Sequence, residues 1–333
     1  MKAIVYRCYG STDVLEFEEV EQPSAAENEV LVKIRAASVH PLDWHYMRGS
    51  PYFMRIMSGF GRPKDERLGV DFAGTVAAVG PGVTRFKPGD EVLGGRTGAF
   101  AEYVAVPEDR ALVLKPTNMT FPQAAAVPVA AITALQALRD KGKVQPGQKV
   151  LINGASGGVG TFAVQIAKAF GAKVTGVCST RNLELVRSIG ADHVIDYKRE
   201  KYTELDQQYD LIVDMVGNHS LLANRRALSP NGTLVMVGGS DGEWLGALMR
   251  PLAAMLLSPF VGQDFVGLLA RIHQEDLSVL HDLMQAGEVT PVIDRTYRLS
   301  EVPLAVAYSE QGRARGKIII DLDLGAADPG VAP

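Results

Sequence analysis

The sequence predicts an α/β protein built from a compact, barrel-like β domain and a second domain with a doubly wound parallel sheet. Short strand-like runs broken by tight turns fill the chain to about Pro116. After Pro146 and Gly147, strand-like and helix-like segments alternate, as they do in doubly wound sheets. The 333 residues suffice for two domains with sizeable cores, and 47% of them are hydrophobic.

The first domain is predicted from its alternation of short strands and turn-forming residues. The expected strands are residues 2–6, 30–36, 73–79, 91–93 and 103–106. Residues 80–82 (Gly-Pro-Gly) and 87–90 (Lys-Pro-Gly-Asp) favour tight reversals between them. Residues 317–321 form one more predicted strand, which we expect to return to this domain.

The second domain is predicted from alternating strands and helices. Residues 122–139 are Ala-rich with a helical pattern, and Pro128 is expected to break or kink this helix. The strands expected after it are residues 150–153, 173–178, 193–195, 210–213, 233–237 and 291–293. The helices expected between them lie near residues 159–170, 183–189, 220–228 and 276–286. This order predicts a parallel sheet with helices on both faces.

A glycine-rich turn joins the first of these strands to the helix that follows it. Gly154, Gly157, Gly158 and Gly160 lie between the apolar run 150–152 and residues with helical spacing. Glycines there let the backbone approach a pyrophosphate, and the helix amino end offers free N–H groups and a positive dipole. Glycine-rich turns also serve as plain turns, but a strand before and a helix after favour a dinucleotide-binding site.

The residues after the second strand of this domain indicate which dinucleotide binds. NAD-binding units carry Asp or Glu there for the ribose hydroxyls, whereas residues 178–182 (Cys-Ser-Thr-Arg-Asn) contain no acid. Ser179 can donate to a 2′-phosphate and Arg181 can neutralise it. Tyr197 and Lys198 are expected near the same corner. We therefore expect NADPH rather than NADH; the alternative is that Arg181 and Lys198 are solvated surface charges.

Composition and charge argue against several classes of protein. The net charge is −4 and no basic block stands out, which disfavours nucleic acid as the main partner. Only two cysteines, Cys8 and Cys178, indicate a reducing compartment without a disulfide framework. The chain opens on a strand-like run with no signal-peptide or transit-peptide pattern, so we expect a cytoplasmic location.

The most apolar stretch, residues 244–260, is not expected to span a membrane. Arg250, Pro251 and Pro259 interrupt it, and a span requires roughly 20 uninterrupted apolar residues. Three interpretations stay open: a buried helix, the wall of a pocket or a contact between subunits, and peripheral contact with a membrane.

Eight segments, spread over nearly the whole chain, match a known family. They are AASVHPLDW (36–44), LGVDFAGTVAAVG (68–80), FKPGDEV (86–92), GAFAEYVAVP (98–107), AAAVPVAAITAL (124–135), NGASGGVG (153–160), GADHVIDY (190–197) and RARGKIII (313–320). With this combination the chain resembles the zinc-independent quinone oxidoreductase branch of the medium-chain dehydrogenase/reductase superfamily. It is most similar to the subgroup that includes the mitochondrial reticulon-interacting reductase and plant chloroplast oxoene reductases.

The resemblance implies a GroES-like catalytic domain made of residues 1–121 and 295–333, with a Rossmann domain, residues 122–294, inserted between them. It also implies an NADPH-binding cleft and the reduction of quinones or α,β-unsaturated carbonyl compounds. Members of this branch are often homodimers. The expected partners are therefore a small-molecule substrate and a second copy of the chain.

The resemblance also assigns cofactor contacts to individual residues. Thr133 is expected at the nicotinamide carboxamide, and Ser156, Gly158 and Val159 are expected to face the pyrophosphate. The full set of expected cofactor-binding residues is Thr133, Ser156, Gly157, Gly158, Val159, Gly160, Ser179, Arg181, Tyr197, Gly238, Arg313 and Arg315. Of these, Ser179, Arg181 and Tyr197 would face the 2′-phosphate. Gly238 and the segment 313–315 would close over the cofactor.

The sequence departs from the zinc-dependent relatives of this branch, so we expect no metal. The resemblance places Ser38, Val39 and His40 where those relatives have a Cys-containing turn, and Asp71 where they have Glu. Metal binding needs several converging ligands, and we interpret His40, Asp43 and Asp71 as an accidental set. Two cysteines cannot build the four-Cys lobe of those relatives. Without a Lewis acid, ordinary alcohol dehydrogenation is disfavoured.

A second departure is His40, at a position where quinone reductases of this branch usually carry Asn. Histidine can donate a hydrogen bond as Asn does, and it can also deliver a proton near neutral pH. His45, Tyr46 and Tyr52 follow at short spacing and complete the candidate catalytic residues. For each of the four, the alternative is a packed aromatic or a surface residue. Asp43 is interpreted as a cap that accepts backbone N–H bonds.

The sequence therefore predicts hydride transfer from NADPH to a quinone or another conjugated carbonyl acceptor. An enone would take the hydride at its β-carbon, and donors near His40 and Tyr52 would stabilise the resulting enolate. Two alternatives stay open. One is an alkenal or enone double-bond reductase with incidental quinone activity, and the other is a catalytically silent NADPH-binding interaction protein.

Overall fold

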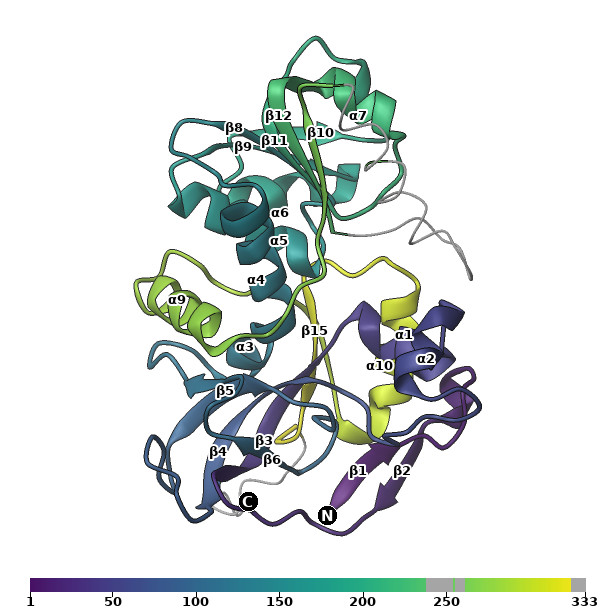
Figure 1. Ribbon diagram of the computed structural model, residues 1–333, viewed down its shortest axis with the longest axis vertical. Helices are drawn as coiled ribbons and strands as arrows, with labels where there is room; N and C mark the ends of the chain where they lie inside the picture. The colour runs from purple at the N-terminus through teal and green to yellow at the C-terminus, as the bar shows by residue number, and fades with distance from the viewer. Residues whose placement is uncertain (238–253, 255–260, 325–333) are drawn as a thin grey trace, which may run out of the picture.

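The computed structural model describes residues 1–237, 254 and 261–324 of the chain. Two lobes are stacked along the long axis of the molecule, with the parallel sheet in the upper lobe (Figure 1). Strand β15 (Lys317–Asp321) brings the chain back into the lower lobe, where it pairs with β14 (Ile293–Tyr297) and β3 (Glu29–Val39). The predicted α/β class, with one β-rich and one doubly wound domain, is confirmed.

The lower lobe contains a seven-stranded sheet. Its order is β14-β15-β3-β4-β5-β7, and β6 pairs with β3. Its other strands are β4 (Asp71–Val79), β5 (Glu91–Gly95), β6 (Tyr103–Pro107) and β7 (Leu112–Leu114), and β1 (Lys2–Val5) pairs separately with β2 (Glu16–Glu19). All five strands expected in the first part of the chain are present, with shifted ends. Because β3 extends to Val39, Ser38 and His40 lie at the end of the sheet.

Three helices lie together on one side of the lower lobe: α1 (Pro41–Arg48), α2 (Arg55–Ser58) and α10 (Val302–Glu310) (Figure 1). Helix α1 follows β3 directly. Pro41 occupies its first position, and Asp43 Oδ2 accepts a hydrogen bond from the His40 backbone N–H at 2.8 Å. The interpretation of Asp43 as a cap is confirmed. The helix ends at Gly49, whose φ of 59° is left-handed.

The upper lobe contains a six-stranded parallel sheet in the order β10-β9-β8-β11-β12-β13. In this strand order, which is that of dinucleotide-binding folds, the ligand crevice lies where the order reverses, here between β8 and β11. The strands are β8 (Lys149–Asn153), β9 (Lys173–Cys178), β10 (His193–Asp196), β11 (Tyr209–Asp214), β12 (Leu228–Met236) and β13 (Asp264–Gly267). The helices after β7 are α3 (Phe121–Ala125), which packs on β3, β4 and β15 of the lower lobe, and then α4 (Pro128–Leu135), α5 (Gly158–Ala169), α6 (Leu183–Ser188), α7 (Leu221–Ala227) and α9 (Gln274–Gln285). Pro128 breaks the Ala-rich helix as expected, because α3 ends before it and α4 begins with it.

The prediction of a strand at residues 291–293 in the parallel sheet is wrong. The strand of this region is β14, which pairs with β15 in the lower-lobe sheet. The sixth parallel strand is instead β13, whose four residues are too few for a clear pattern. The apolar stretch 244–260 lies outside the described residues except for Ala254, which is buried. Within the described ranges, no helix has the length and apolar character to cross a bilayer.

One hydrophobic core extends across both lobes. It joins Ala36 and Ala73 of the lower-lobe sheet to α4, α5 and β8 of the upper lobe. Ala130, Ala131 and Ala134 on α4 are at most 2% exposed, and their small side chains let this helix approach its neighbours closely. Helix α4 therefore links the end of the lower-lobe sheet to the glycine-rich turn.

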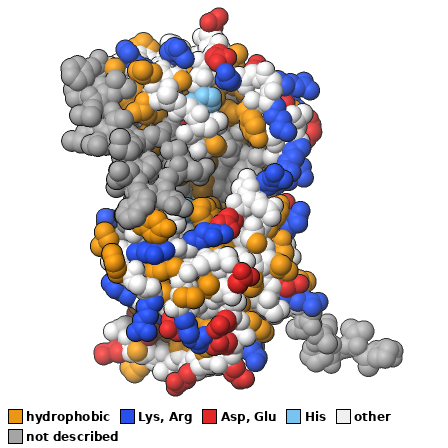
Figure 2. Space-filling view, turned by 90° about the vertical axis from the view of Figure 1, so that its right-hand side faces the viewer, with side chains coloured by type: hydrophobic (Ala, Val, Ile, Leu, Met, Phe, Trp, Pro, Cys, Tyr) orange, Lys and Arg blue, Asp and Glu red, His pale blue; other side chains and the backbone are white. Residues whose placement is uncertain are grey.

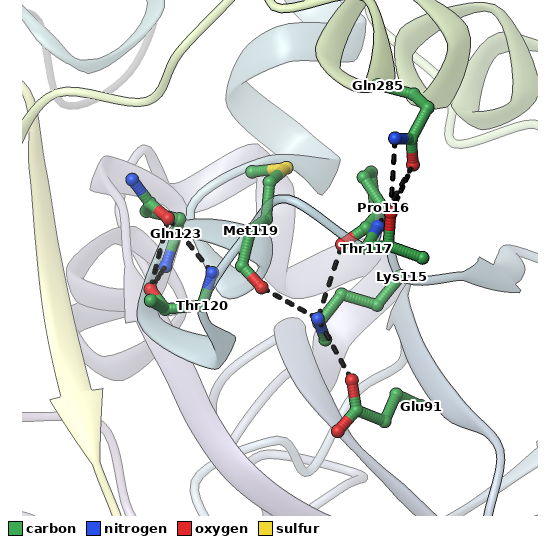
Figure 3. A network of polar contacts seen from close by, with 8 residues as sticks. All are labelled: Glu91, Lys115, Pro116, Thr117, Met119, Thr120, Gln123 and Gln285. Carbon is green, nitrogen blue, oxygen red and sulfur yellow. Dashed lines mark hydrogen bonds and ion pairs between the residues drawn. The ribbon is translucent and has the colours of Figure 1, made fainter.

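The segment between β7 and α3 is held around a buried lysine (Figure 3). Lys115 Nζ donates to the Met119 carbonyl oxygen at 2.7 Å and pairs with Glu91 of β5 at 2.9 Å. Its side chain is only 6% exposed, so the ammonium depends on these protein partners. The Thr117 backbone N–H donates to Gln285 Oε1 of α9 at 3.0 Å. These bonds fix the segment against β5 and α9.

Candidate active site

Three glycines shape the turn between β8 and α5. Gly154 has a φ of 93°, which residues with side chains rarely adopt. A Cβ on Gly160 would lie 2.1 Å from the Gly154 carbonyl oxygen, so only glycine lets α5 start this close to the strand. Among the described atoms, a Cβ on Gly157 would meet only that same oxygen, at 3.5 Å. The turn therefore leaves room for a ligand beside the amino end of α5, as a pyrophosphate site requires.

The residues predicted to face a 2′-phosphate come together at the carboxyl ends of β9 and β10. Ser179 is buried and precedes the short 3₁₀ turn Thr180–Asn182. The Arg181 guanidinium donates to the Arg313 carbonyl oxygen at 2.9 Å. Tyr197 is exposed, and its backbone N–H is bonded to the end of β9. This corner is therefore formed by two strand ends and by a segment from the far end of the sequence.

Asp196, the last residue of β10, is a charged member of the same corner. Its Oδ2 accepts a bond from the Thr180 hydroxyl at 2.6 Å, and its Oδ1 accepts the Lys198 backbone N–H at 3.0 Å. The bond from Thr180 is the main cause that holds the pKa of Asp196 below its usual range. Because both oxygens accept bonds from the corner itself, this carboxylate fixes the two loops against each other.

Residues 313–316, named the strap here, join this corner to the lower lobe. The Arg315 guanidinium donates to Asn182 Oδ1 at 2.9 Å and to the Arg181 carbonyl oxygen at 3.0 Å. Asn182 in turn donates to Ser156 Oγ of the glycine-rich turn at 2.8 Å. Arg315 is therefore a tether between the lobes, and its guanidinium is engaged by protein groups at the place where the cofactor is expected.

Next to the glycine-rich turn, a set of polar side chains is buried together, each at most 5% exposed. This buried polar cluster consists of Ser38, His40, Asp43, Asp71 and Lys317. Asp71 accepts bonds from the Ser38 hydroxyl and from the Val129 backbone N–H, each at 3.0 Å. Lys317 Nζ lies 3.4 Å from Asp71 Oδ2, and its Cδ lies 3.3 Å from the position of a Cβ on Gly158. The cluster therefore contacts both α4 and the glycine-rich turn.

His40 is the cluster member whose ring lacks a partner. Among the described residues, neither ring nitrogen has a hydrogen-bond partner, although the side chain is only 4% exposed. Nδ1 lies 3.6 Å from Asp43 Oδ2, which is within ion-pair distance but beyond a good hydrogen bond. Burial is the main cause that raises the pKa of Asp43. Since buried polar groups are normally paired, this ring is suited to meet a ligand.

The other three candidate catalytic residues lie on α1 and in the 3₁₀ turn after it. His45 Nδ1 lies 2.7 Å from the Ser50 carbonyl oxygen, and its ring stacks on the preceding tryptophan at 3.6 Å. The Arg55 guanidinium packs over the Tyr52 ring at 4.7 Å, and Tyr46 is exposed. These are the contacts of packed or surface aromatic residues, the alternative that the sequence left open.

Thr133 lies on α4, one turn after Val129. Its hydroxyl donates to the Val129 carbonyl oxygen at 2.6 Å, and the residue is buried. Because the Val129 backbone N–H is bonded to Asp71, the buried polar cluster also holds the helix that carries Thr133. Gly238, which was expected to close over the cofactor, lies outside the described residues.

Lys317, Asn182 and Asp196 are site residues that sequence reasoning missed. A signal for Lys317 was present, because a lysine at the head of the buried strand 317–321 needs a buried partner. Asn182 and Asp196 had no such signal, since polar residues at strand ends and loops are common.

The residues present fit a nicotinamide dinucleotide. The turn at Gly157 is open, the corner at Arg181 is basic, and the buried ring of His40 has unused hydrogen-bonding capacity. These three features are those that a pyrophosphate, a 2′-phosphate and a reacting group beside a nicotinamide call for. In the part of the chain that the structure describes, no group of three or more His, Cys, Asp or Glu could hold a metal ion.

Two protein families match the chain along most of its length. The alcohol dehydrogenase GroES-like domain matches residues 26–117, and the zinc-binding dehydrogenase family matches residues 189–320. The chain belongs to the medium-chain dehydrogenase/reductase superfamily, whose members are oxidoreductases that use a nicotinamide cofactor. Together with the parallel sheet, these matches confirm the expected fold class, a GroES-like domain and a Rossmann domain.

Within this superfamily, the chain belongs to the quinone oxidoreductase branch. It is 35% identical to a chloroplast envelope quinone oxidoreductase homolog of Arabidopsis thaliana, over 96% of this chain and 98% of the relative. It is 36% identical to a 2-methylene-furan-3-one reductase of Solanum lycopersicum, over 96% and 79% of the two chains. Among solved structures, the quinone oxidoreductase from Coxiella burnetii superimposes with a TM-score of 0.84 at 30% identity, over 97% and 99% of the chains. The predicted resemblance is confirmed.

Proposed function

We propose that this protein is an NADPH-dependent, zinc-independent reductase of quinones and other conjugated carbonyl compounds. The observation that carries the proposal is the buried ring of His40, which has no hydrogen-bond partner among the described residues and lies in the cluster that touches α4 and the glycine-rich turn. A conjugated carbonyl acceptor needs a hydride at carbon and a hydrogen bond or proton at oxygen. The site offers a place for a hydride donor and one unused polar group for that oxygen.

The preference for NADPH over NADH is supported by the corner after β9. Residues 178–182 contain no carboxylate that would repel a 2′-phosphate, and the Arg181 guanidinium is held there by the strap. The oxygens of Asp196 are engaged by Thr180 and Lys198. Figure 2 shows Lys and Arg side chains along one edge of the upper lobe, down to the waist between the lobes. An extra phosphate is favoured in such a field.

In this proposal, different residues bind the cofactor and supply the proton. When bound, the cofactor supplies a hydride from its reduced nicotinamide. The glycine-rich turn would hold the pyrophosphate at the amino end of α5, and Thr133 on α4 would orient the nicotinamide end. His40 donates a hydrogen bond to the acceptor oxygen and passes a proton to it as the hydride reaches carbon. The acceptor thus gains one hydride and one proton. An enone gives an enol and then a saturated ketone. A quinone gives a hydroquinone, directly when the hydride goes to a carbonyl oxygen and after tautomerisation when it goes to a ring carbon.

We propose that the reaction needs no metal, because the candidate oxygen ligands are already in use. Asp71 accepts a bond from Ser38 and lies beside the Lys317 ammonium, and Asp43 accepts the His40 backbone N–H. A divalent cation on Asp71 would be placed next to a buried positive charge, which is unfavourable. Elemental analysis of the purified protein, with turnover measured before and after chelation, checks this point.

The acceptor has two candidate classes within the same chemistry. Quinones are named for the Arabidopsis thaliana and Coxiella burnetii relatives, whereas alkenals and enones are named for an Arabidopsis thaliana alkenal/one oxidoreductase that is 33% identical. The experiment is to measure kcat/KM for NADPH oxidation with naphthoquinones and with alkenals and vinyl ketones. Higher values for quinones support the first class, and higher values for enones support a double-bond reductase. If NADPH protects the protein against heat but neither class is reduced, the chain is a silent NADPH-binding protein.

We also propose that the protein acts as a cytoplasmic homodimer. Cys8 and Cys178 are both free thiols, which suits a reducing compartment. Among the described strands, β13 is one of the two edges of the parallel sheet, and an edge strand can pair with a second copy of the chain. Light scattering on the purified protein should give twice the chain mass of 35.8 kDa, and a mass of one chain would contradict the dimer.

A further inference from the structure

The buried polar cluster has an unbalanced charge unless it binds a proton. Asp43 and Asp71 are 1% and 0% exposed, and Lys317 is 2% exposed. With both carboxylates ionised and His40 neutral, two negative charges and one positive charge are removed from water. An uncompensated buried charge is strongly unfavourable, and one bound proton removes it.

The geometry favours the pair His40–Asp43 as the holder of that proton. Asp71 has donors of its own, because the Ser38 hydroxyl donates to it and the Lys317 ammonium lies 3.4 Å away. Among the described residues of the cluster, Asp43 accepts a hydrogen bond only from the His40 backbone N–H, and His40 Nδ1 lies 3.6 Å from Asp43 Oδ2. Burial, the largest cause, raises the pKa of Asp43, and the neighbouring His40 opposes that shift. A proton is therefore better placed on this pair than on Asp71.

The remaining ionisable groups around the pair come from other elements. Asp71 faces it from β4, Lys317 from β15 and Tyr6 from the residue after β1, while Tyr46 lies on α1 itself. Burial raises the pKa of Tyr6, so this phenol stays neutral near pH 7. Asp71 and Lys317 compensate each other as an ion pair. Within the cluster, His40 and Asp43 are therefore the ionisable groups that this ion pair leaves to each other.

We propose that the His40–Asp43 pair stores one proton, that His40 delivers it to the acceptor oxygen, and that Asp43 is the positioning residue that retains it on the ring. The transfer breaks an N–H bond of His40 and forms the O–H bond of the reduced acceptor, and the ring is reprotonated from solvent. The negative charge of Asp43 favours the protonated ring, whereas the positive charge of Lys317 opposes it. This inference rests on the proposed reductase function, because it names the source of its proton.

The test is an NMR titration of the His40 ring in the cofactor-free protein. His40→Asn identifies its signal among the six histidines of the chain. Asp43→Asn keeps an oxygen that can accept the His40 backbone N–H but removes the negative charge near the ring. The titration midpoint of the His40 ring should therefore fall by about one pH unit or more. Lys317→Met keeps the apolar stem but removes the positive charge, so the midpoint should rise.

The opposite signs of these two shifts separate a proton-holding role from a structural one. A structural role predicts loss of stability in both variants without opposite movements of the midpoint. Lys168→Met is the matched control, because its ammonium pairs with Asp192 outside the cluster, and it should leave the midpoint unchanged. Shifts of the same sign in Asp43→Asn and Lys317→Met, or no shifts, would overturn the inference. If Asp43→Asn does not fold, Lys317→Met alone is decisive: a rise of the His40 midpoint supports the inference, and an unchanged midpoint overturns it.

Turnover of the same variants distinguishes this inference from the proposed function. The pH at which kcat falls should move in the direction of the NMR midpoint in each variant. If the variants still reduce an acceptor but their His40 titration midpoints do not shift, Asp43 has no role in the proton transfer, and the proposed reductase function is retained. Opposite NMR shifts in a protein that reduces no acceptor would overturn the proposed function, and the delivery step with it.

Discussion

In the proposed function, Arg181 is the residue expected to favour NADPH over NADH at the corner after β9. Its guanidinium donates to the Arg313 carbonyl oxygen, so it is held in place before a phosphate binds. A charge-assisted hydrogen bond contributes about 1.5–3 kcal/mol, so Arg181→Ala should weaken NADPH binding by roughly 10- to 100-fold. NADH lacks the 2′-phosphate and should bind almost unchanged. Calorimetric titration with both dinucleotides measures the two affinities.

A neighbouring arginine provides the control for this experiment. Arg187 on α6 pairs with Glu184 and is not a predicted phosphate contact. Arg187→Ala should leave both affinities unchanged. Equal weakening of NADPH and NADH by Arg181→Ala would show that the 2′-phosphate lies elsewhere.

His40→Asn introduces the residue that the resemblance implies for quinone reductases. Asn can still donate a hydrogen bond to the acceptor oxygen, but it cannot transfer a proton. Hydride transfer should therefore persist, while the dependence of kcat on pH should flatten between about pH 5 and 8. Steady-state rates over that range, with the wild-type protein beside the variant, test this. An unaltered profile would exclude His40 as the proton donor.

Residues inside a local motif could be predicted from the sequence, and residues assembled by the fold could not. The glycine-rich turn and Arg181 follow directly from a strand and its end, so their places were expected. Asp71 and Lys317 lie far apart in the chain, and only the pairing of β3 with β4 and with β15 brings them together. Strand register of this kind depends on tertiary packing rather than on nearby residues.

The segment between β7 and α3 owes its position to Lys115, whose ammonium is almost fully buried. Lys115→Met would leave the Met119 carbonyl oxygen without this donor and should lower the free energy of unfolding by about 1–3 kcal/mol. Lys2→Met, which removes an exposed pair with Glu19, should change it by less than about 0.5 kcal/mol. Urea unfolding measures both variants. Equal effects would mean that the buried bonds in this segment contribute little.

Elements with a strong local pattern were predictable, and short elements were not. The break at Pro128 follows from the fixed φ and missing N–H of proline, and α3 and α4 confirm it. Strand β13 has four residues, and β14 joins the lower-lobe sheet rather than the parallel one. Both strands are identified by their pairing partners, which a local pattern does not specify.

At the scale of the whole molecule, the two lobes are joined at both ends of the site. The strap contacts the corner after β9 through Arg315, and Lys317, directly after the strap, belongs to the buried polar cluster. The division into residues 1–121 with 295–333 and 122–294 stays a prediction, and β14 begins two residues before the second boundary. One short segment therefore contacts both the corner after β9 and the buried polar cluster.

The most direct measurement of the proposed function is single-turnover oxidation of NADPH by protein shown to be free of metal. The protein is mixed with NADPH and then with a naphthoquinone or an enone, while the loss of NADPH absorbance is followed. We predict that NADPH is oxidised only when an acceptor is present, that NADH reacts more slowly, and that added zinc gives no increase. A reaction that requires zinc, or one that is faster with NADH, would contradict the proposed function.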